Sequence, residues 1–148
     1  MTELFPYLAF EKAKDAIAYY EEVFGAKNVK RLEVSEEQAE QFGMTKEQAA
    51  EATMHAEFEV LGVKILCSDS FGRVENINNG ISLLIDFDVN NQDDSDRVQQ
   101  FYDEIKDHDS LDIEMPLKEQ FWGGKMGAFT DKYGVRWMLH GQDYTKLN

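Results

Sequence analysis

Two histidines and a glutamate are the side chains of this sequence best suited to hold a metal ion. His55 and Glu57 stand two residues apart in an alternating segment, so they share one face of a predicted strand. His140 lies in the last predicted strand, on the same face as Met138. Three such ligands could form a catalytic metal site if their strands met. The spacing is not specific to metals, however, and ordinary polar residues on a half-solvated face explain it better.

Other reactive side chains have simpler explanations than catalysis. A nucleophilic cysteine needs a lowered pKa and a nearby base, but the setting of Cys67 after Ile65 and Leu66 indicates a buried, inert thiol. Asp86 could act as a general base in a cleft, whereas Asp88 is more simply a turn residue. No phosphate-cradling glycine motif and no G-x-S-x-G motif occurs. The sequence therefore identifies no catalytic residue.

Phe121 and Trp122 form an aromatic pair in a loop that continues with Gly123 and Gly124. Aromatic side chains on loops suit flat or apolar ligands. The same pair could instead plug the end of a barrel-like sheet. The sequence leaves both interpretations open.

The elements that would position these residues occur twice along the chain. Residues 4–25 and 81–106 each read as an alternating strand, a polar break and an amphipathic helix with an aromatic pair near its end. Strand-like segments follow each helix, and the last of them begins at a glycine in both halves, Gly62 and Gly134. The pattern predicts β-α-β-β-β twice.

This repeat predicts an α+β fold built of two βαβββ modules, about residues 1–70 and 80–148, joined by a short linker. We expect a single domain with a curved mixed sheet, helices on its outer face and a central cleft. In such an architecture the cleft is where function is expected.

Residues 35–53 interrupt the first module and differ from it in character. Ser35 and Thr45 each begin a capping-box pattern, which predicts two short helices broken at Gly43. Phe42 and Met44 lie between them. We prefer a surface insertion that these two apolar residues anchor to the body, and a lid over the cleft is the alternative.

Composition limits the classes of partner. The 148 residues carry a formal charge of −14, which argues against nucleic acid and anionic membrane surfaces. The single cysteine allows no internal disulfide, and the sequence shows neither a signal peptide nor an apolar stretch of membrane-spanning length. We expect a cytoplasmic protein without nucleic-acid or membrane partners.

Several motifs, spread from near the first residue to near the last, resemble one known family. They are Pro6-x-Leu8-x-Phe10, Ala16-x-x-Tyr19-Tyr20-x-x-Val23-Phe24-Gly25, His55-Ala56-Glu57-Phe58, Pro116-Leu117 with Phe121-Trp122-Gly123, and Asp131-Lys132-Tyr133-Gly134-Val135-x-Trp137. Together they resemble the vicinal-oxygen-chelate superfamily of glyoxalases, extradiol dioxygenases, fosfomycin-resistance enzymes and bleomycin-binding proteins. The closest resemblance is to its PhnB-like branch, often labelled as a 3-demethylubiquinone methyltransferase domain. The resemblance implies the fold and a homodimer in which partner modules complete the clefts.

The resemblance also implies where a metal would bind. Metal-using members place four ligands on the first and last strands of the two modules. The matching positions in this sequence are Phe5, Leu66, Ser82 and Met138. Phenylalanine, leucine and methionine cannot bind a hard or borderline cation, and a lone serine hydroxyl is a poor ligand. We therefore expect no metal at the usual site and no cofactor. No S-adenosylmethionine-binding glycine motif is visible either.

Three functions remain as hypotheses. The first is a protein that binds a small apolar or aromatic molecule in its cleft without the usual metal. The residues expected to contact it are Phe5, Tyr7, His55, Glu57, Leu66, Ser82, Trp122, Met138 and His140. The second is a metal-dependent lyase, isomerase or dioxygenase with an atypical site around His55, Glu57 and His140. The third is a scaffold whose dimer surface matters and whose cleft is filled.

Overall fold

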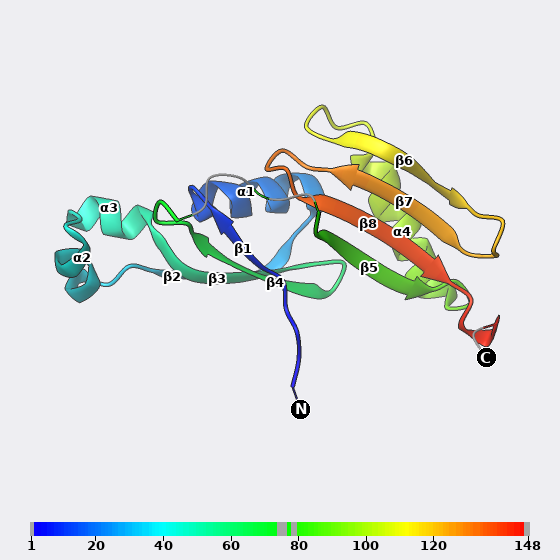
Figure 1. The fold of residues 1–148 in the computed structure, drawn as a ribbon, viewed down its shortest axis with the longest axis horizontal. Helices are drawn as coiled ribbons and strands as arrows, with labels where there is room; N and C mark the ends of the chain where they lie inside the picture. The colour runs from blue at the N-terminus through cyan, green and yellow to red at the C-terminus, as the bar shows by residue number, and fades with distance from the viewer. Residues whose placement is uncertain (1, 74–76, 78–79, 147–148) are drawn as a thin grey trace. The chain divides into compact units, whose positions relative to one another are not determined.

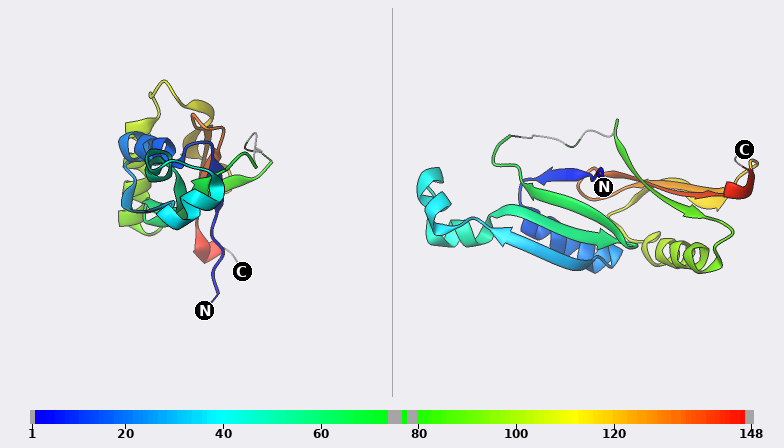
Figure 2. Two further views of the ribbon diagram at one scale, coloured as in Figure 1. Left: turned by 90° about the vertical axis from the view of Figure 1, so that its left-hand side faces the viewer. Right: turned by 90° about the horizontal axis from the view of Figure 1, so that it is seen from below.

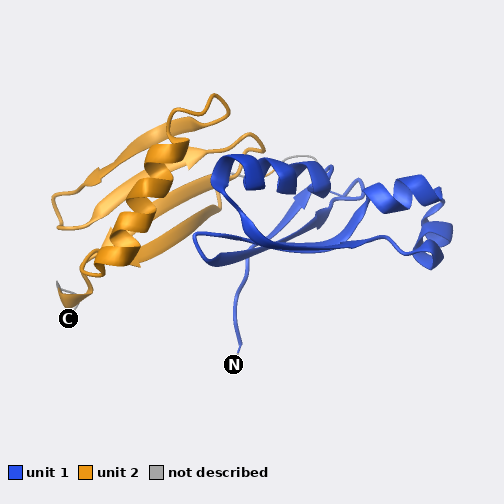
Figure 3. Cartoon of the chain, turned by 180° about the vertical axis from the view of Figure 1, so that it is seen from behind, with its two compact units in different colours: residues 1–75 blue, residues 76–148 orange. Residues whose placement is uncertain are grey.

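The computed structural model describes residues 2–73, 77 and 80–146. The chain divides into two compact units, unit 1 (Met1–Glu75) and unit 2 (Asn76–Asn148) (Figure 3). The two units have the same order of principal elements, a strand, a long helix and three further strands. The twofold repeat predicted from the sequence is therefore present in the structure.

The described residues of unit 1 form one mixed sheet and three helices (Figure 1). Its elements are β1 (Tyr7–Phe10), α1 (Ala13–Phe24), β2 (Lys27–Glu33), α2 (Glu36–Phe42), α3 (Lys46–Glu51), β3 (Thr53–Val60) and β4 (Val63–Asp69). The strand order is β1-β4-β3-β2. β1 runs parallel to β4, and the other neighbours are antiparallel.

Unit 2 repeats this arrangement. Its elements are β5 (Ser82–Asp88), α4 (Gln92–Ile105), β6 (Asp112–Glu119), β7 (Lys125–Thr130), β8 (Arg136–Gln142) and the short 3-10 helix η1 (Tyr144–Lys146). The strand order is β5-β8-β7-β6, with β5 parallel to β8. The α+β fold is thus confirmed, and the eight strands form two mixed four-stranded sheets, one in each unit.

One face of each sheet is covered by the long helix of the same unit (Figure 2). In unit 1 the apolar stripe of α1 faces the sheet, and the ring of Tyr20 stacks on Phe58 with 5.2 Å between centroids. Gly25 ends this helix in the left-handed conformation, with φ 67°. The backbone N–H of Ala13 donates to Asp69 Oδ1 at 2.8 Å, so the end of β4 fixes the start of α1.

In unit 2 the covering helix is α4, which contacts β5. Its buried residues are Val98, Phe101, Tyr102 and Ile105, so α4 is the amphipathic helix that the sequence predicted. Asn91 caps its start, because the Asn91 side chain accepts the backbone N–H of Asp94. In both units the opposite face of the sheet carries the polar and half-exposed side chains.

The first strand is shorter than the sequence suggested. We predicted a strand from Leu4, but β1 begins at Tyr7, and Leu4 is 97% exposed. Pro6 accounts for the difference, since it has no backbone N–H to donate. Its carbonyl still accepts the N–H of Leu66, and regular pairing starts at the next residue.

The insertion between β2 and β3 forms the two predicted helices. Both capping boxes are present, and Gly43 separates the helices with φ 68°. Their buried residues form a small core of Val34, Ala39, Ala49 and Ala52, with Met44 and Met54 packed against it. Phe42 lies against Phe71, with 6.1 Å between ring centroids. These contacts agree with the anchored insertion that we preferred.

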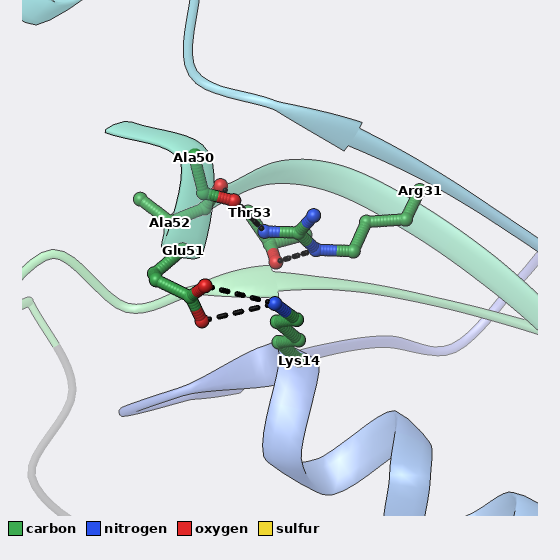
Figure 4. Close-up of polar contacts among 6 residues, drawn as sticks. All are labelled: Lys14, Arg31, Ala50, Glu51, Ala52 and Thr53. Atoms are coloured by element: carbon green, nitrogen blue, oxygen red, sulfur yellow. Dashed lines mark hydrogen bonds and ion pairs between the residues drawn. The ribbon is translucent and has the colours of Figure 1, made fainter. Parts of the chain in front are cut away.

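Two basic side chains tie the end of α3 to the rest of unit 1 (Figure 4). Arg31 donates through Nε to Thr53 Oγ1 at 2.8 Å, and through Nη2 to the carbonyl oxygens of Ala50 and Ala52 at 2.9 and 3.0 Å. Lys14 of α1 contacts both carboxylate oxygens of Glu51 at 3.0 Å. Arg31 thus satisfies carbonyl groups that a helix end leaves without helical partners.

None of the helices in the described part of the chain combines the length and the apolar character needed to cross a membrane.

Candidate functional site

The uncovered face of the unit 1 sheet brings five of the predicted site residues together. We call the group Phe5, Tyr7, His55, Glu57, Lys64 and Leu66 the first open face. Tyr7 of β1 pairs with Leu66 of β4, which pairs in turn with Glu57 of β3. Residues directly opposite in a sheet project from the same face, so these three side chains form one row. Phe5 lies before β1, where Lys64 Nζ is 5.8 Å from its ring centroid.

His55 contacts an aromatic neighbour across this face. Its Nδ1 is 3.1 Å from the Tyr7 hydroxyl, and the two ring centroids are 5.6 Å apart. The hydroxyl can donate or accept, so this contact is compatible with either neutral tautomer of the imidazole. The contact joins two residues that the sequence placed on different strands.

Glu57 lies between two lysines. Its carboxylate is 3.4 Å from Lys30 Nζ and 3.5 Å from Lys64 Nζ. Desolvation raises the pKa of Glu57, but attraction by Lys64 and Lys30 outweighs it, and the net pKa lies below its ordinary value. A cation bound by this carboxylate would have to compete with both ammonium groups.

The uncovered face of the unit 2 sheet holds the other predicted site residues. We call the group Ser82, Leu84, Asp86, Trp122, Arg136, Met138 and His140 the second open face. β5 and β8 pair in register there, with Ser82 opposite Arg136, Leu84 opposite Met138, and Asp86 opposite His140. Along the strands, the face presents first the cation Arg136, then the apolar pair Leu84 and Met138, and last the His140–Asp86 pair.

The histidine at the end of this face is held by two neighbours. His140 Nδ1 is 2.8 Å from Asp86 Oδ1. The indole of Trp122 stacks on the imidazole with 5.4 Å between centroids and 23° between planes. Asp86 was considered as a base from its sequence, but its pairing with His140 was not expected. The alternation that places Asp86 on the same strand face as Ser82 is the sequence signal that could have found it.

Arg136 is a residue of this face that sequence reasoning missed. Its Nη1 donates to Ser82 Oγ at 2.8 Å, and its Nη2 forms an ion pair with Glu114. The hydrogen bond from Arg136 lowers the pKa of Glu114, although desolvation opposes the shift. The Ser82 hydroxyl, at the position of a usual metal ligand by resemblance, is therefore bonded to a guanidinium group.

Trp122 reaches His140 because Gly124 has no side chain to obstruct the indole. A Cβ added at Gly124 would come within 1.9 Å of the Trp122 ring and 2.2 Å of the Gly141 carbonyl oxygen. Phe121, by contrast, is fully exposed. The two aromatic side chains therefore differ in burial: Trp122 is half-buried against the sheet of unit 2, and Phe121 is in solvent.

The remaining reactive residues have the structural settings that we expected. Cys67 is a buried free thiol, and desolvation, with the nearby charge of Asp69, raises its pKa to about 12. Such a thiol is a poor nucleophile. Asp88 accepts the backbone N–H of Asn90 at 2.9 Å, as a turn residue does.

Within residues 2–73, 77 and 80–146, the His, Cys, Asp and Glu side chains form no group of three or more that could hold a metal ion. His55 and Glu57 belong to unit 1, and His140 belongs to unit 2. Each has a protein partner of its own in the structure.

Comparison with known proteins identifies the family. The family model described as 3-demethylubiquinone-9 3-methyltransferase matches residues 2–140. Protein YjdN of Escherichia coli (strain K12) is 29% identical over 147 residues, which cover 93% of each chain.

Solved structures agree on the fold. Protein PA1353 from Pseudomonas aeruginosa has a TM-score of 0.62 at 25% identity, covering 96% of this chain and 98% of that one. A PhnB protein from Bacillus cereus gives a TM-score of 0.58 at 23% identity, covering 95% and 100%. The fosfomycin resistance protein FosX from Listeria monocytogenes gives 0.55 at 15% identity, covering 96% and 93%. The chain therefore belongs to the 3-demethylubiquinone-9 3-methyltransferase family, the PhnB-like branch of the vicinal-oxygen-chelate superfamily.

Proposed function

We propose that this protein binds a small apolar or aromatic molecule on the open faces of its sheets, without a metal at the superfamily's usual site. The observation that carries the proposal is the half-buried indole of Trp122, stacked on His140 on the same face as the exposed Leu84. Ligand sites in proteins combine apolar and aromatic surface with a few placed polar groups. The second open face has that composition.

The first open face has a similar character. Tyr7 is 50% exposed and Phe5 is 37% exposed, and Leu66 continues the row. The polar groups beside them are His55 and the Glu57–Lys64 pair. The usual metal positions, transferred by resemblance, are occupied by apolar side chains or by the Arg136-bound Ser82. This supports an organic ligand rather than a metal complex.

We do not propose an atypical metal enzyme around His55, Glu57 and His140. A metal there would have to replace the Lys30 and Lys64 partners of Glu57, and also the Tyr7 and Asp86 contacts of the histidines if it bound through their Nδ1 atoms. We also do not propose methyl transfer, although the family description names it, because the sequence shows no S-adenosylmethionine-binding glycine motif.

We propose further that two copies of the chain associate as a homodimer, as the superfamily resemblance implies. Sedimentation equilibrium tests this directly. A mass of twice the 17.1 kDa chain is expected, and a single-chain mass at micromolar concentration would contradict it.

A thermal-shift screen with a matched pair of variants tests ligand binding. Wild-type protein, Trp122→Ala and Phe121→Ala are screened against one panel of aromatic and aliphatic compounds, with divalent metals and EDTA as separate arms. We expect a saturable rise in Tm with an aromatic compound for wild type and Phe121→Ala, and its loss in Trp122→Ala. The proposal fails if no compound gives a saturable shift, or if Trp122→Ala responds as wild type does.

A further inference from the structure

The His140–Asp86 pair determines which kind of polar group the second open face can recognise. An ionised carboxylate only accepts hydrogen bonds, so the 2.8 Å contact with Asp86 Oδ1 requires the proton on His140 Nδ1. In the neutral ring, Nε2 then carries a lone pair and can only accept. The described residues provide no hydrogen-bond partner for Nε2.

The surroundings of His140 indicate what would reach Nε2. The row across the sheet reads Asp86, His140, Met126 and Lys118, from β5 to β6. Trp122 covers one face of the imidazole ring. A ligand at this point meets an aromatic surface, an apolar neighbour and one acceptor, with a lysine farther along the row. Lys125, next to Met126, donates instead to Gln99 of α4.

We propose that His140 Nε2 accepts the hydroxyl proton of a planar ligand, so that the ligands of this face are phenols or enols. This inference rests on the ligand binding proposed above. The ligand O–H bond breaks and an N–H bond forms at Nε2, which leaves a phenolate or enolate beside an imidazolium. Asp86, as a positioning residue, holds the ring in the accepting tautomer and compensates the imidazolium charge.

A chromophoric phenol and its methyl ether test the proposal. 4-Nitrophenol absorbs differently as phenol and phenolate, and 4-nitroanisole has the same ring without a hydroxyl donor. We expect 4-nitrophenol to bind more tightly than 4-nitroanisole and to develop the phenolate band on binding. In His140→Gln the band is lost and affinity for 4-nitrophenol falls by roughly tenfold, the effect of one hydrogen bond. Affinity for 4-nitroanisole, which has no hydroxyl proton to give to Nε2, falls less than affinity for 4-nitrophenol.

Two further variants separate recognition from folding. Asp86→Asn can donate to Nδ1, which favours the Nε2–H tautomer and turns the acceptor into a donor. We expect this variant to remain folded and to lose the phenolate band. His108→Gln is the matched control, because His108 contacts Ser110 in the turn after α4, and it retains wild-type behaviour.

Nitrogen-15 spectra of labelled histidine give an independent measurement on the unliganded protein. The chain has three histidines, and the variants assign their signals. An Nδ1–H tautomer for His140 that switches in Asp86→Asn is expected, and an Nε2–H tautomer in the wild type would overturn the inference.

The outcomes distinguish the two proposals. Equal binding of both probes, unaffected by His140→Gln, would leave the ligand-binding function standing and overturn the role of Nε2. If neither probe binds saturably, aromatic-ligand binding fails, and the inference that rests on it fails too.

Discussion

The indole of Trp137 donates its N–H to Asp131 Oδ2 at 2.8 Å, across the hairpin that joins β7 and β8. The other oxygen, Oδ1, accepts the backbone N–H groups of Tyr133 and Val135 at 2.8 and 3.1 Å. Trp137 is 1% exposed and Asp131 is 5% exposed. The Asp131-Lys132-Tyr133-Gly134-Val135-x-Trp137 motif, one of those that resemble the family, therefore stabilises the hairpin between β7 and β8.

These three hydrogen bonds to Asp131 predict a large loss of stability in Asp131→Ala. The change leaves the buried Trp137 N–H and two backbone N–H groups without their acceptor, which should cost about 3 kcal/mol. Urea unfolding measures the difference. Asp107→Ala, at an exposed position, serves as control and should stay within about 0.5 kcal/mol of wild type. Equal stability of the two variants would show that the hairpin does not depend on Asp131.

Gly124 should be indispensable for the position of Trp122. In Gly124→Ala the added Cβ overlaps the indole and the Gly141 carbonyl, so the Trp122–His140 stack must open. Fluorine NMR of protein labelled with fluorotryptophan has two signals to follow, and the Trp122 signal should move. Gly134→Ala, where a Cβ meets nothing within 4 Å, imposes only backbone strain of about 1 kcal/mol. It should leave that signal in place.

Arg31 should control the local stability of the α2–α3 insertion. Lysine cannot reproduce the fork of hydrogen bonds to Thr53, Ala50 and Ala52. Arg31→Lys should therefore accelerate amide hydrogen exchange across residues 36–51, with a cost of about 1–3 kcal/mol.

The neighbouring ion pair offers the comparison for that experiment. Lys14 and Glu51 are 47% and 70% exposed, and exposed pairs contribute about 0–1 kcal/mol. Lys14→Gln should change exchange in the insertion only slightly. A larger increase in amide exchange for Lys14→Gln than for Arg31→Lys would show that the ion pair, and not Arg31, stabilises the insertion.

Cys67 predicts a loss of stability in alkaline solution. Burial raises its pKa from 9.0 to about 12, so the folded chain keeps a proton that the unfolded chain releases. The contribution of the Cys67 thiol to the free energy of unfolding is complete below pH 9 and decreases as the pH rises toward 12. Subtracting the unfolding free energy of Cys67→Ala, measured at the same pH, removes the titration of other groups. This difference in unfolding free energy should decrease as the pH rises from 9 to 12, and a constant difference would refute the prediction.

Local patterns explain which parts of the fold could be predicted. The two capping boxes and the amphipathic character of α4 depend on residues close in sequence, and they occur as expected. The early start assigned to β1 was wrong, because the alternation at Leu4 was followed past a proline.

The candidate site depends on contacts that spacing cannot provide. His140 and Asp86 meet because β5 and β8 are neighbours in register, although 54 residues separate them. The two lysines that form ion pairs with Glu57 come from the strands on either side of β3. Sequence alternation identified the faces of these strands, but the pairing of strands determined which side chains touch.

The strand order has a consequence for synthesis of the chain on the ribosome. In each unit the first strand pairs with the last, β1 with β4 and β5 with β8. The sheet of unit 1 has all its strands once Asp69 has emerged, while β5 must wait for β8 before it gains its neighbour. We therefore expect folding during synthesis in two stages, with the unit 1 sheet forming first. Until β8 has been synthesised, β5 has no strand to pair with and is exposed to mispairing, which chaperones or rapid synthesis of β8 would limit.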